Sequence, residues 1–157
     1  RENEAARIRY PSKTEDLHHE VELVLAIGEG GGVIGSAVGL DMTRRDLQLQ
    51  MKDRRGPWTI GKDFLDSAPI GPIVLGDPPV SGRIALTVDG VVRQHGDVSL
   101  MMHGPEALVS RVNAFCPLQA GDLIFTGTPS GVGSVTPGQV LEATIEGLPP
   151  LIVHVDG

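Results

Sequence analysis

Acidic side chains lie at the start of an apolar run in the segment HHEVELVLAIG. In an extended strand, residues two apart share a face, so His18, Glu20 and Glu22 should point to one side. Two carboxylates about 7 Å apart on one face repel each other unless a cation lies between them. A hard divalent ion such as Mg²⁺ or Mn²⁺ prefers oxygen ligands and keeps positions open for water or substrate. The spacing is therefore compatible with a metal site, although the solvated face of a strand gives the same Glu-x-Glu pattern.

A second set of polar residues follows in GLDMTRRDLQ. Thr43 as the N-cap, with Asp46 three positions later, predicts the start of a helix of about 9 to 11 residues. Asp41 would then stand just before this helix as a third carboxylate. Arg45 and Gln48, three positions apart, would share one helix face and could bind an anionic substrate beside the ion. An exposed helix face is the simpler alternative for this pair.

Two further candidates lie in loop-like segments. Lys62 is flanked by glycine and apolar residues in PWTIGKDF, where a partly desolvated ammonium group can face developing negative charge. The segment TGTPSGVG can present backbone N–H groups and the Thr128 hydroxyl to an anion. A surface lysine and a glycine turn without chemistry are the ordinary alternatives, so neither residue identifies a function by itself.

The segment GGGVIG matches the dinucleotide-binding pattern through Gly30, Gly32 and Gly35. That pattern requires a helix to begin at the last glycine, whereas the next helix signal is at Thr43. We therefore do not expect a nucleotide site. Three isolated histidines are expected to be ordinary polar side chains rather than ligands: His95, His103 and His154.

Length and charge restrict the class of protein. The chain has 157 residues, of which 40% are apolar, which suits one domain with a buried core. The net charge of −7 argues against nucleic acid as a partner, because phosphate binding needs a basic surface. No apolar run approaches the ~18 residues of a membrane span. Cys116 is the single cysteine, so no internal disulfide is expected, and we interpret it as a small buried residue. These features predict a soluble, cytoplasmic protein.

Composition and the predicted elements favour a β-rich α+β fold. Glycine (21) and proline (12) are abundant, and short runs of branched aliphatic residues alternate with turn residues. Asp89-Gly90 predicts a two-residue hairpin turn because both residues tolerate positive φ. Pro105 is expected to begin a helix that ends near Phe115, and residues 56–75 are expected to be mostly loop. Strands are expected over residues 18–27 and in the segments DLIF, QVLEATIEG and LIVHV.

Four segments, in this order, resemble the fumarylacetoacetate hydrolase family: HHEVELVLAIG, GLDMTRRDLQ, PWTIGKDF and GDLIFTGTPSGVG. The similarity extends from about Tyr10 to Gly157, and the first and third segments are most similar to the acylpyruvate and fumarylpyruvate hydrolase branch. The resemblance implies a mixed β-roll or sandwich with a few short helices, a single catalytic domain over residues 1–157, and a homodimer.

The resemblance also implies roles for the candidate residues. The implied ligands of Mg²⁺ or Mn²⁺ are Glu20, Glu22 and Asp41. The implied catalytic residue is Lys62, and the implied substrate-binding residues are Arg45, Gln48 and Thr128. Two departures from the family accompany these assignments. No histidine precedes His18, so the upstream lid segment with its His-x-x-Glu base is not expected within this chain. Only 18 residues separate Glu22 from Asp41, fewer than in the family.

The reaction implied by the resemblance is hydrolysis of a carbon–carbon bond in a β-diketo acid. An acylpyruvate such as fumarylpyruvate would give pyruvate and a carboxylic acid, as in the catabolism of aromatic compounds. Three alternatives use the same site: decarboxylation of oxaloacetate, tautomerisation of a keto acid, and metal binding without catalysis.

Overall fold

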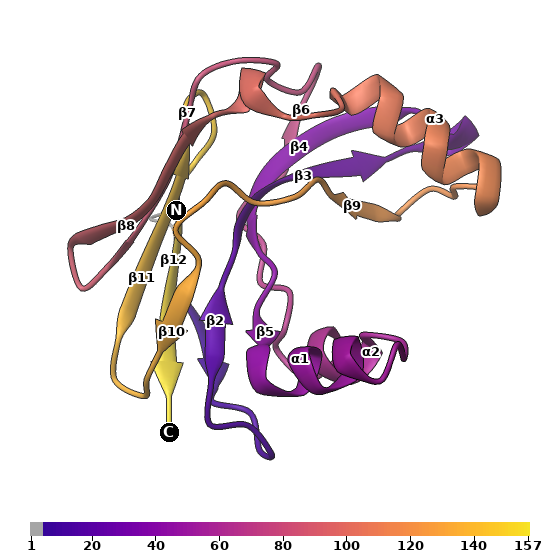
Figure 1. Ribbon diagram of the computed structural model, residues 1–157. Coiled ribbons are helices and arrows are strands. Elements are labelled where there is room, and N and C mark those ends of the chain that lie inside the picture. Colours follow the sequence, from indigo (N-terminus) through magenta and orange to yellow (C-terminus); the bar gives the residue numbers. More distant parts are fainter. Residues whose placement is uncertain (1–4) are drawn as a thin grey trace.

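The computed structural model describes residues 5–157, whose strands form three β-sheets (Figure 1). The largest sheet has the strand order β1-β12-β11-β7-β8. β1 is parallel to β12, and the other neighbours are antiparallel. The bounds of its strands are Ala6–Arg9 (β1), Arg83–Val88 (β7), Val91–Asp97 (β8), Val140–Ile145 (β11) and Leu151–Asp156 (β12).

The two smaller sheets are antiparallel and have the strand orders β6-β4-β3-β9 and β10-β2-β5. All residues of β3 are buried, on both faces of the strand. The bounds are Val21–Ile27 (β3), Val33–Leu40 (β4), Val74–Leu75 (β6) and Leu123–Phe125 (β9) in the first, and Leu17–His19 (β2), Thr43–Arg44 (β5) and Gly133–Val135 (β10) in the second.

The chain passes from one small sheet to the other at Glu20. The prediction of one continuous strand over residues 18–27 is therefore wrong: β2 ends at His19 and β3 begins at Val21 (Figure 1). β2 pairs with β5 and β10, whereas β3 pairs with β4 and β9. Glu20 consequently lies at the junction of two sheets, outside the ladder of either.

A tight hairpin brings Asp41 back to Glu20. β3 and β4 are joined by a short 3-10 turn, Glu29–Gly31 (η1), closed by a 2.8 Å hydrogen bond from the Gly28 N–H to the Gly32 carbonyl. Glu22 faces Gly39 across the hairpin, and the Asp41 N–H donates to the Glu20 carbonyl at 2.9 Å. The 18 residues between Glu22 and Asp41 thus form a closed hairpin, whose register shifts once, between Ala26 and Ile27.

Helices lie at the edges of the sheets. The first, α1, spans Arg45–Asp53, and its nine residues agree with the predicted length. Thr43, however, lies in β5, and Arg44 precedes the helix without a side-chain cap, so the predicted capping role of Thr43 is wrong. Asp46 instead accepts a hydrogen bond from the Thr14 hydroxyl at 2.6 Å. Its carboxylate is therefore used to attach the preceding loop to α1.

Other predictions fare differently. The hairpin at Asp89-Gly90 is confirmed, with φ values of 50° and 77°. The helix α3 has the predicted bounds, Pro105–Phe115, and follows a 3-10 turn at Val98–Leu100 (η2). Residues 56–75 are mostly loop but also contain β6 and a four-residue helix, Thr59–Lys62 (α2), which is too short to show an apolar period. Cys116 is exposed, so the prediction that it is buried is wrong.

The apolar core joins the large sheet to the hairpin of β3 and β4. Its members are branched aliphatic residues on the inner faces, including Leu23, Leu25, Val38, Leu86 and Leu141, each at most 1% exposed. This arrangement confirms the predicted β-rich fold with a few short helices. None of the helices within residues 5–157 has both the length and the apolar character needed to cross a membrane.

Candidate metal centre

Three carboxylates converge where the two small sheets meet. Glu20 lies at the junction of β2 and β3, Glu22 on β3, and Asp41 directly after β4. One carboxylate oxygen from each residue lies within 4.8 Å of the others. Glu20 and Glu22 are 8% and 4% exposed, so this is not the solvated face of a strand.

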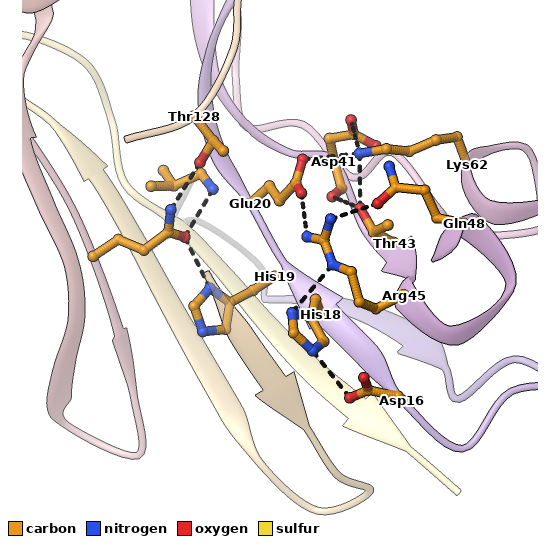
Figure 2. A network of polar contacts seen from close by, with 12 residues as sticks. Asp16, His18, His19, Glu20, Asp41, Thr43, Arg45, Gln48, Lys62 and Thr128 are labelled. Carbon is orange, nitrogen blue, oxygen red and sulfur yellow. Dashed lines mark hydrogen bonds and ion pairs between the residues drawn. The ribbon is translucent and has the colours of Figure 1, made fainter. Parts of the chain in front are cut away.

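Lys62 places its ammonium group between two of these carboxylates (Figure 2). The Nζ atom donates to Glu20 Oε2 at 2.8 Å, Asp41 Oδ2 at 2.6 Å and Thr43 Oγ1 at 2.8 Å. A lysine ammonium group has three N–H donors, so each is directed at one of these oxygens. Lys62, the last residue of the short helix α2, thus contacts two of the three carboxylates.

Arg45 connects the cluster to helix α1. Its guanidinium group donates to Glu20 Oε1 and, at 2.6 Å, to Gln48 Oε1 (Figure 2). This contact confirms that Arg45 and Gln48 share one helix face. The Arg45 Nε–H also points to His18 Nδ1 at 3.4 Å, and His18 Nε2 lies 3.0 Å from Asp16 Oδ1. Because Nδ1 must accept from arginine, His18 carries a proton on Nε2.

Two carboxyl groups of this cluster have raised pKa values. Burial raises the pKa of Glu22 to about 7, the hydrogen bond from the Gly127 N–H opposes this shift, and the negative charges of the nearby Asp41 and Glu20 add to it. Burial also raises the pKa of Asp41, although its hydrogen bond to Lys62 opposes the shift. Two acidic groups of the cluster therefore hold their protons more tightly than free carboxyl groups do.

The donor set fits a hard divalent cation. All three side chains offer carboxylate oxygen, the ligand that Mg²⁺ and Mn²⁺ favour, and no sulfur or imidazole nitrogen belongs to the cluster. A divalent ion would also favour the ionised forms of Glu22 and Asp41, whose pKa values are raised. Glu20, Glu22 and Asp41 are thus suitable ligands for such an ion.

Thr128 lies apart from the other predicted residues. Figure 2 shows Thr128 and His19 on one side of Glu20, and Lys62 and Gln48 on the other. Its loop is nevertheless attached to the cluster, because the N–H of Gly127 donates to Glu22 Oε2 at 2.7 Å. Thr128 also lines a cavity of about 450 Å³, whose wall includes Leu23, His95, Asp97, Met101 and Gly127.

Sequence reasoning missed three contributors to the site. Thr43 accepts from Lys62, but its place after Asp41 suggested a helix cap instead. The Gly127 N–H binds Glu22, although only the general anion-binding character of its loop was predicted. Gln94, a buried residue of β8, contacts both His19 and Thr128, and no motif marks it.

Comparison with known proteins identifies the family. The model of the fumarylacetoacetate hydrolase C-terminal domain matches residues 3–156. The chain belongs to the fumarylacetoacetate hydrolase family. The predicted fold and the predicted family membership are thereby confirmed.

Individual members of the fumarylacetoacetate hydrolase family are similar over most of the chain. A fumarylpyruvate hydrolase from Ralstonia sp. is 38% identical over 162 residues, covering 96% of this chain and 84% of its own length. A mitochondrial oxaloacetate tautomerase from Rattus norvegicus is 37% identical over 158 residues, covering 92% and 72%. The crystal structure of fumarylpyruvate hydrolase from Pseudomonas aeruginosa in complex with Mn²⁺ and pyruvate is 44% identical. It has a TM-score of 0.92 and covers 97% of this chain and 71% of that chain.

Proposed function

We propose that this protein is a metal-dependent hydrolase that cleaves a carbon–carbon bond in an acylpyruvate such as fumarylpyruvate. The products are pyruvate and a carboxylic acid. The proposal is carried by one observation: two buried carboxylates and one half-buried carboxylate meet Lys62 and Arg45. This arrangement occurs in a chain similar to a fumarylpyruvate hydrolase and to a structure of such an enzyme with Mn²⁺ and pyruvate.

The proposal assigns one role to each group of residues. The metal ligands are Glu20, Glu22 and Asp41. The catalytic residue is Lys62, and the substrate-binding residues are Arg45, Gln48 and Thr128. When bound, Mg²⁺ or Mn²⁺ supplies a Lewis acid that polarises oxygen atoms of the keto acid. Support for these assignments comes from the oxygen-only donor set and from the positive charge of Lys62 and Arg45 beside it.

The side chains can promote the reaction through charge and orientation. Water adds to the distal carbonyl carbon, and the bond between this carbon and the methylene carbon breaks. The electron pair of that bond passes to the pyruvyl fragment, whose keto oxygen gains negative charge before the methylene carbon is protonated. The Lys62 ammonium group can stabilise this charge, and Arg45 with Gln48 can hold the terminal carboxylate of the substrate.

A direct assay tests the hydrolase proposal. The protein is incubated with fumarylpyruvate or acetylpyruvate and Mg²⁺ or Mn²⁺, and the absorbance of the diketo acid is followed while pyruvate is measured. Loss of absorbance with one pyruvate formed for each substrate molecule supports hydrolysis. Loss of absorbance without pyruvate counts against it.

Oxaloacetate chemistry is the second candidate. The 37% identity to an oxaloacetate tautomerase favours it. Acylpyruvate hydrolysis and oxaloacetate tautomerisation both involve an enol or enolate form of a keto acid. A faster interconversion of enol and keto oxaloacetate would identify a tautomerase, and release of carbon dioxide would identify a decarboxylase. Metal binding without any of these activities would indicate a metal-binding protein that does not catalyse a reaction.

The proposal also includes a homodimer, with magnesium as the metal and a cytoplasmic role in aromatic catabolism. Large apolar side chains around α3 are highly exposed, among them Leu100 (78%), Met102 (95%) and Phe115 (93%). Such exposure is typical of a surface that binds another protein chain. Light scattering coupled to size exclusion should give twice the monomer mass, and a monomer at micromolar concentration would contradict the dimer.

A further inference from the structure

Gln94 is a buried polar residue to which no role in the reaction has been assigned. Its side chain on β8 is 0% exposed. Its Oε1 atom accepts from the Val21 N–H at 3.1 Å and lies 2.8 Å from His19 Nδ1. Its Nε2 atom donates to Thr128 Oγ1 at 2.8 Å and to the Pro129 carbonyl at 2.9 Å. A primary amide has two N–H donors and one oxygen with two lone pairs, so its whole capacity is used.

The neighbours of Gln94 permit only one orientation of its amide group. The backbone N–H of Val21 can only donate, and the Pro129 carbonyl can only accept. Rotation of the amide by 180° would oppose two donors at Val21 and two acceptors at Pro129. The oxygen therefore faces β3, His19 carries its proton on Nδ1, and the amide N–H is directed at Thr128.

This orientation determines how Thr128 can form hydrogen bonds. Its hydroxyl oxygen already receives an N–H from Gln94, so its own O–H proton must point away from that amide. Among residues 5–157, no side chain or carbonyl accepts that proton. Thr128 is thereby presented as a hydrogen-bond donor beside the loop that also holds Glu22.

The backbone of β8 at Gln94 and the backbone of the loop at Gly131 lie in close contact. A two-residue turn at Asp89-Gly90 would pair Leu86 with Arg93, but a register shift next to Leu86 pairs it with Gln94. Gly131 has a φ of 99°, and a Cβ atom there would lie 2.2 Å from the Arg93 carbonyl oxygen. The glycine-rich loop can therefore pack directly on β8 where Gln94 turns inward.

We infer that Gln94 is a positioning residue that orients the Thr128 hydroxyl to donate to an oxygen atom of the keto-acid substrate. The amide also joins the start of β3, between the carboxylates Glu20 and Glu22, to the loop that carries Thr128. This inference rests on the proposed function, because it takes Thr128 as a substrate-binding residue. The ligand chemistry it requires is an acceptor, namely a keto or carboxylate oxygen.

A double-mutant cycle between Gln94 and Thr128 tests the inference. Gln94→Glu keeps the acceptor that faces β3 but replaces the donor with an oxygen that draws the Thr128 proton to itself. We expect KM for acylpyruvate, and the Kd for pyruvate measured by calorimetry with Mn²⁺, to rise roughly 10- to 100-fold. In a Thr128→Val background the same substitution should have little further effect, whereas Thr128→Ser should restore its effect.

A second variant and a control keep the test decisive. Gln94→Met removes both polar groups at similar volume, should raise the same constants by a smaller factor, and also should lose its effect beside Thr128→Val. Gln50→Glu, the same change at an exposed position of α1, should leave both constants unaltered.

The outcomes separate the inference from the proposed function. If the factors by which the Gln94 and Thr128 substitutions raise KM and Kd simply multiply in the double variant, Gln94 acts independently of Thr128. That result would overturn the inference and leave the hydrolase proposal standing. If no pyruvate is formed from acylpyruvate but the Gln94 and Thr128 substitutions still have non-additive effects on the Kd for pyruvate, only the hydrolase proposal would be overturned. A wild-type protein that does not bind pyruvate with Mn²⁺ would overturn the positioning role as well.

Discussion

Lys62 makes contacts in this structure that differ from those that the proposed catalytic role requires. Its three donors are directed at Glu20, Asp41 and Thr43. A group that stabilises charge on a substrate must give up at least one of these oxygens. Binding of a divalent ion to the carboxylates would weaken the hold of Glu20 and Asp41 on the ammonium group, so metal binding and the availability of Lys62 should be linked.

At the residue scale, we first predict the effect of Lys62→Ala. Turnover should fall by roughly two to three orders of magnitude, because a positive charge next to the developing negative charge is lost. Affinity for Mg²⁺ or Mn²⁺ should be unchanged or tighter, since the ion no longer competes with the ammonium group. Steady-state kinetics and calorimetry measure the two effects. Lys52→Ala, an exposed position on α1, is the control, and unchanged turnover of Lys62→Ala would remove the lysine from the mechanism.

The raised pKa of Glu22 predicts a pH dependence of stability in the metal-free protein. Its folded value of about 7 exceeds the usual 4.5, so between these values the unfolded chain releases a proton that the folded protein keeps. The free energy of unfolding should therefore fall as pH rises from about 4.5 to 7, by on the order of 3 kcal/mol. Over the same range, metal affinity should increase, because the ion needs the ionised carboxylate.

Urea denaturation at pH 5 and pH 7.5, with chelator present, measures this dependence. Glu22→Gln should remove most of it and abolish activity, because the amide cannot ionise and is a poor ligand. Glu106→Gln, at an exposed position of α3, should retain it. A wild-type stability that rises between these pH values would contradict the assignment.

At the element scale, the contact between α1 and α2 positions Lys62. A Cβ atom at Gly61 would lie 2.9 Å from Gln48 Cβ and 3.1 Å from Gln48 Cα, closer than side-chain contacts normally allow. The absence of a side chain at Gly61 lets the two helices approach until Lys62 reaches the carboxylates. The four residues of α2 have little helical stability of their own, so this packing matters more than propensity.

We predict that Gly61→Ala lowers kcat roughly 10²-fold by displacing α2 by a fraction of an ångström or more. Metal affinity should change little, because the three carboxylates are on other elements. Gly56→Ala in the same connection is the matched control, since its Cβ would meet only ordinary contacts of 3.5 Å and beyond. Equal activity of the two variants would show that the close approach does not position Lys62.

At the scale of the whole molecule, metal and fold should be thermodynamically linked. The three carboxylates belong to different points of the fold, at a sheet junction, on a strand and after a strand. An unfolded chain does not hold them together, so an ion binds the folded state preferentially.

Removal of metal with a chelator should therefore lower the melting temperature. With metal at 100 times its Kd, linkage contributes about 2.7 kcal/mol, or roughly 5 to 11 °C for a chain of this size. Calorimetry with and without excess chelator measures the shift, and the triple variant Glu20→Gln, Glu22→Gln, Asp41→Asn should show none. A wild-type melting temperature indifferent to metal would argue against a bound ion.

Several local features of this protein can be predicted from its sequence. The hairpin at Asp89-Gly90 follows from the φ preferences of two residues, and the start of α3 follows from Pro105. The sharing of a face by Arg45 and Gln48 follows from helix geometry alone. These features depend on interactions within a few residues, and such interactions are visible in sequence.

The contacts between residues far apart in the chain depend on the folded arrangement of the sheets. The chain breaks at Glu20 because β2 and β3 pair with strands of different sheets. Thr43 lies in β5, where its hydroxyl accepts from Lys62 and does not cap α1. Gln94 is brought to Thr128 by a bulge and by a glycine loop that packs against it, 34 residues away. Such contacts are set by how sheets pack against one another. No spacing along the chain encodes them directly, because the free energy that selects them comes from burial of the core as a whole.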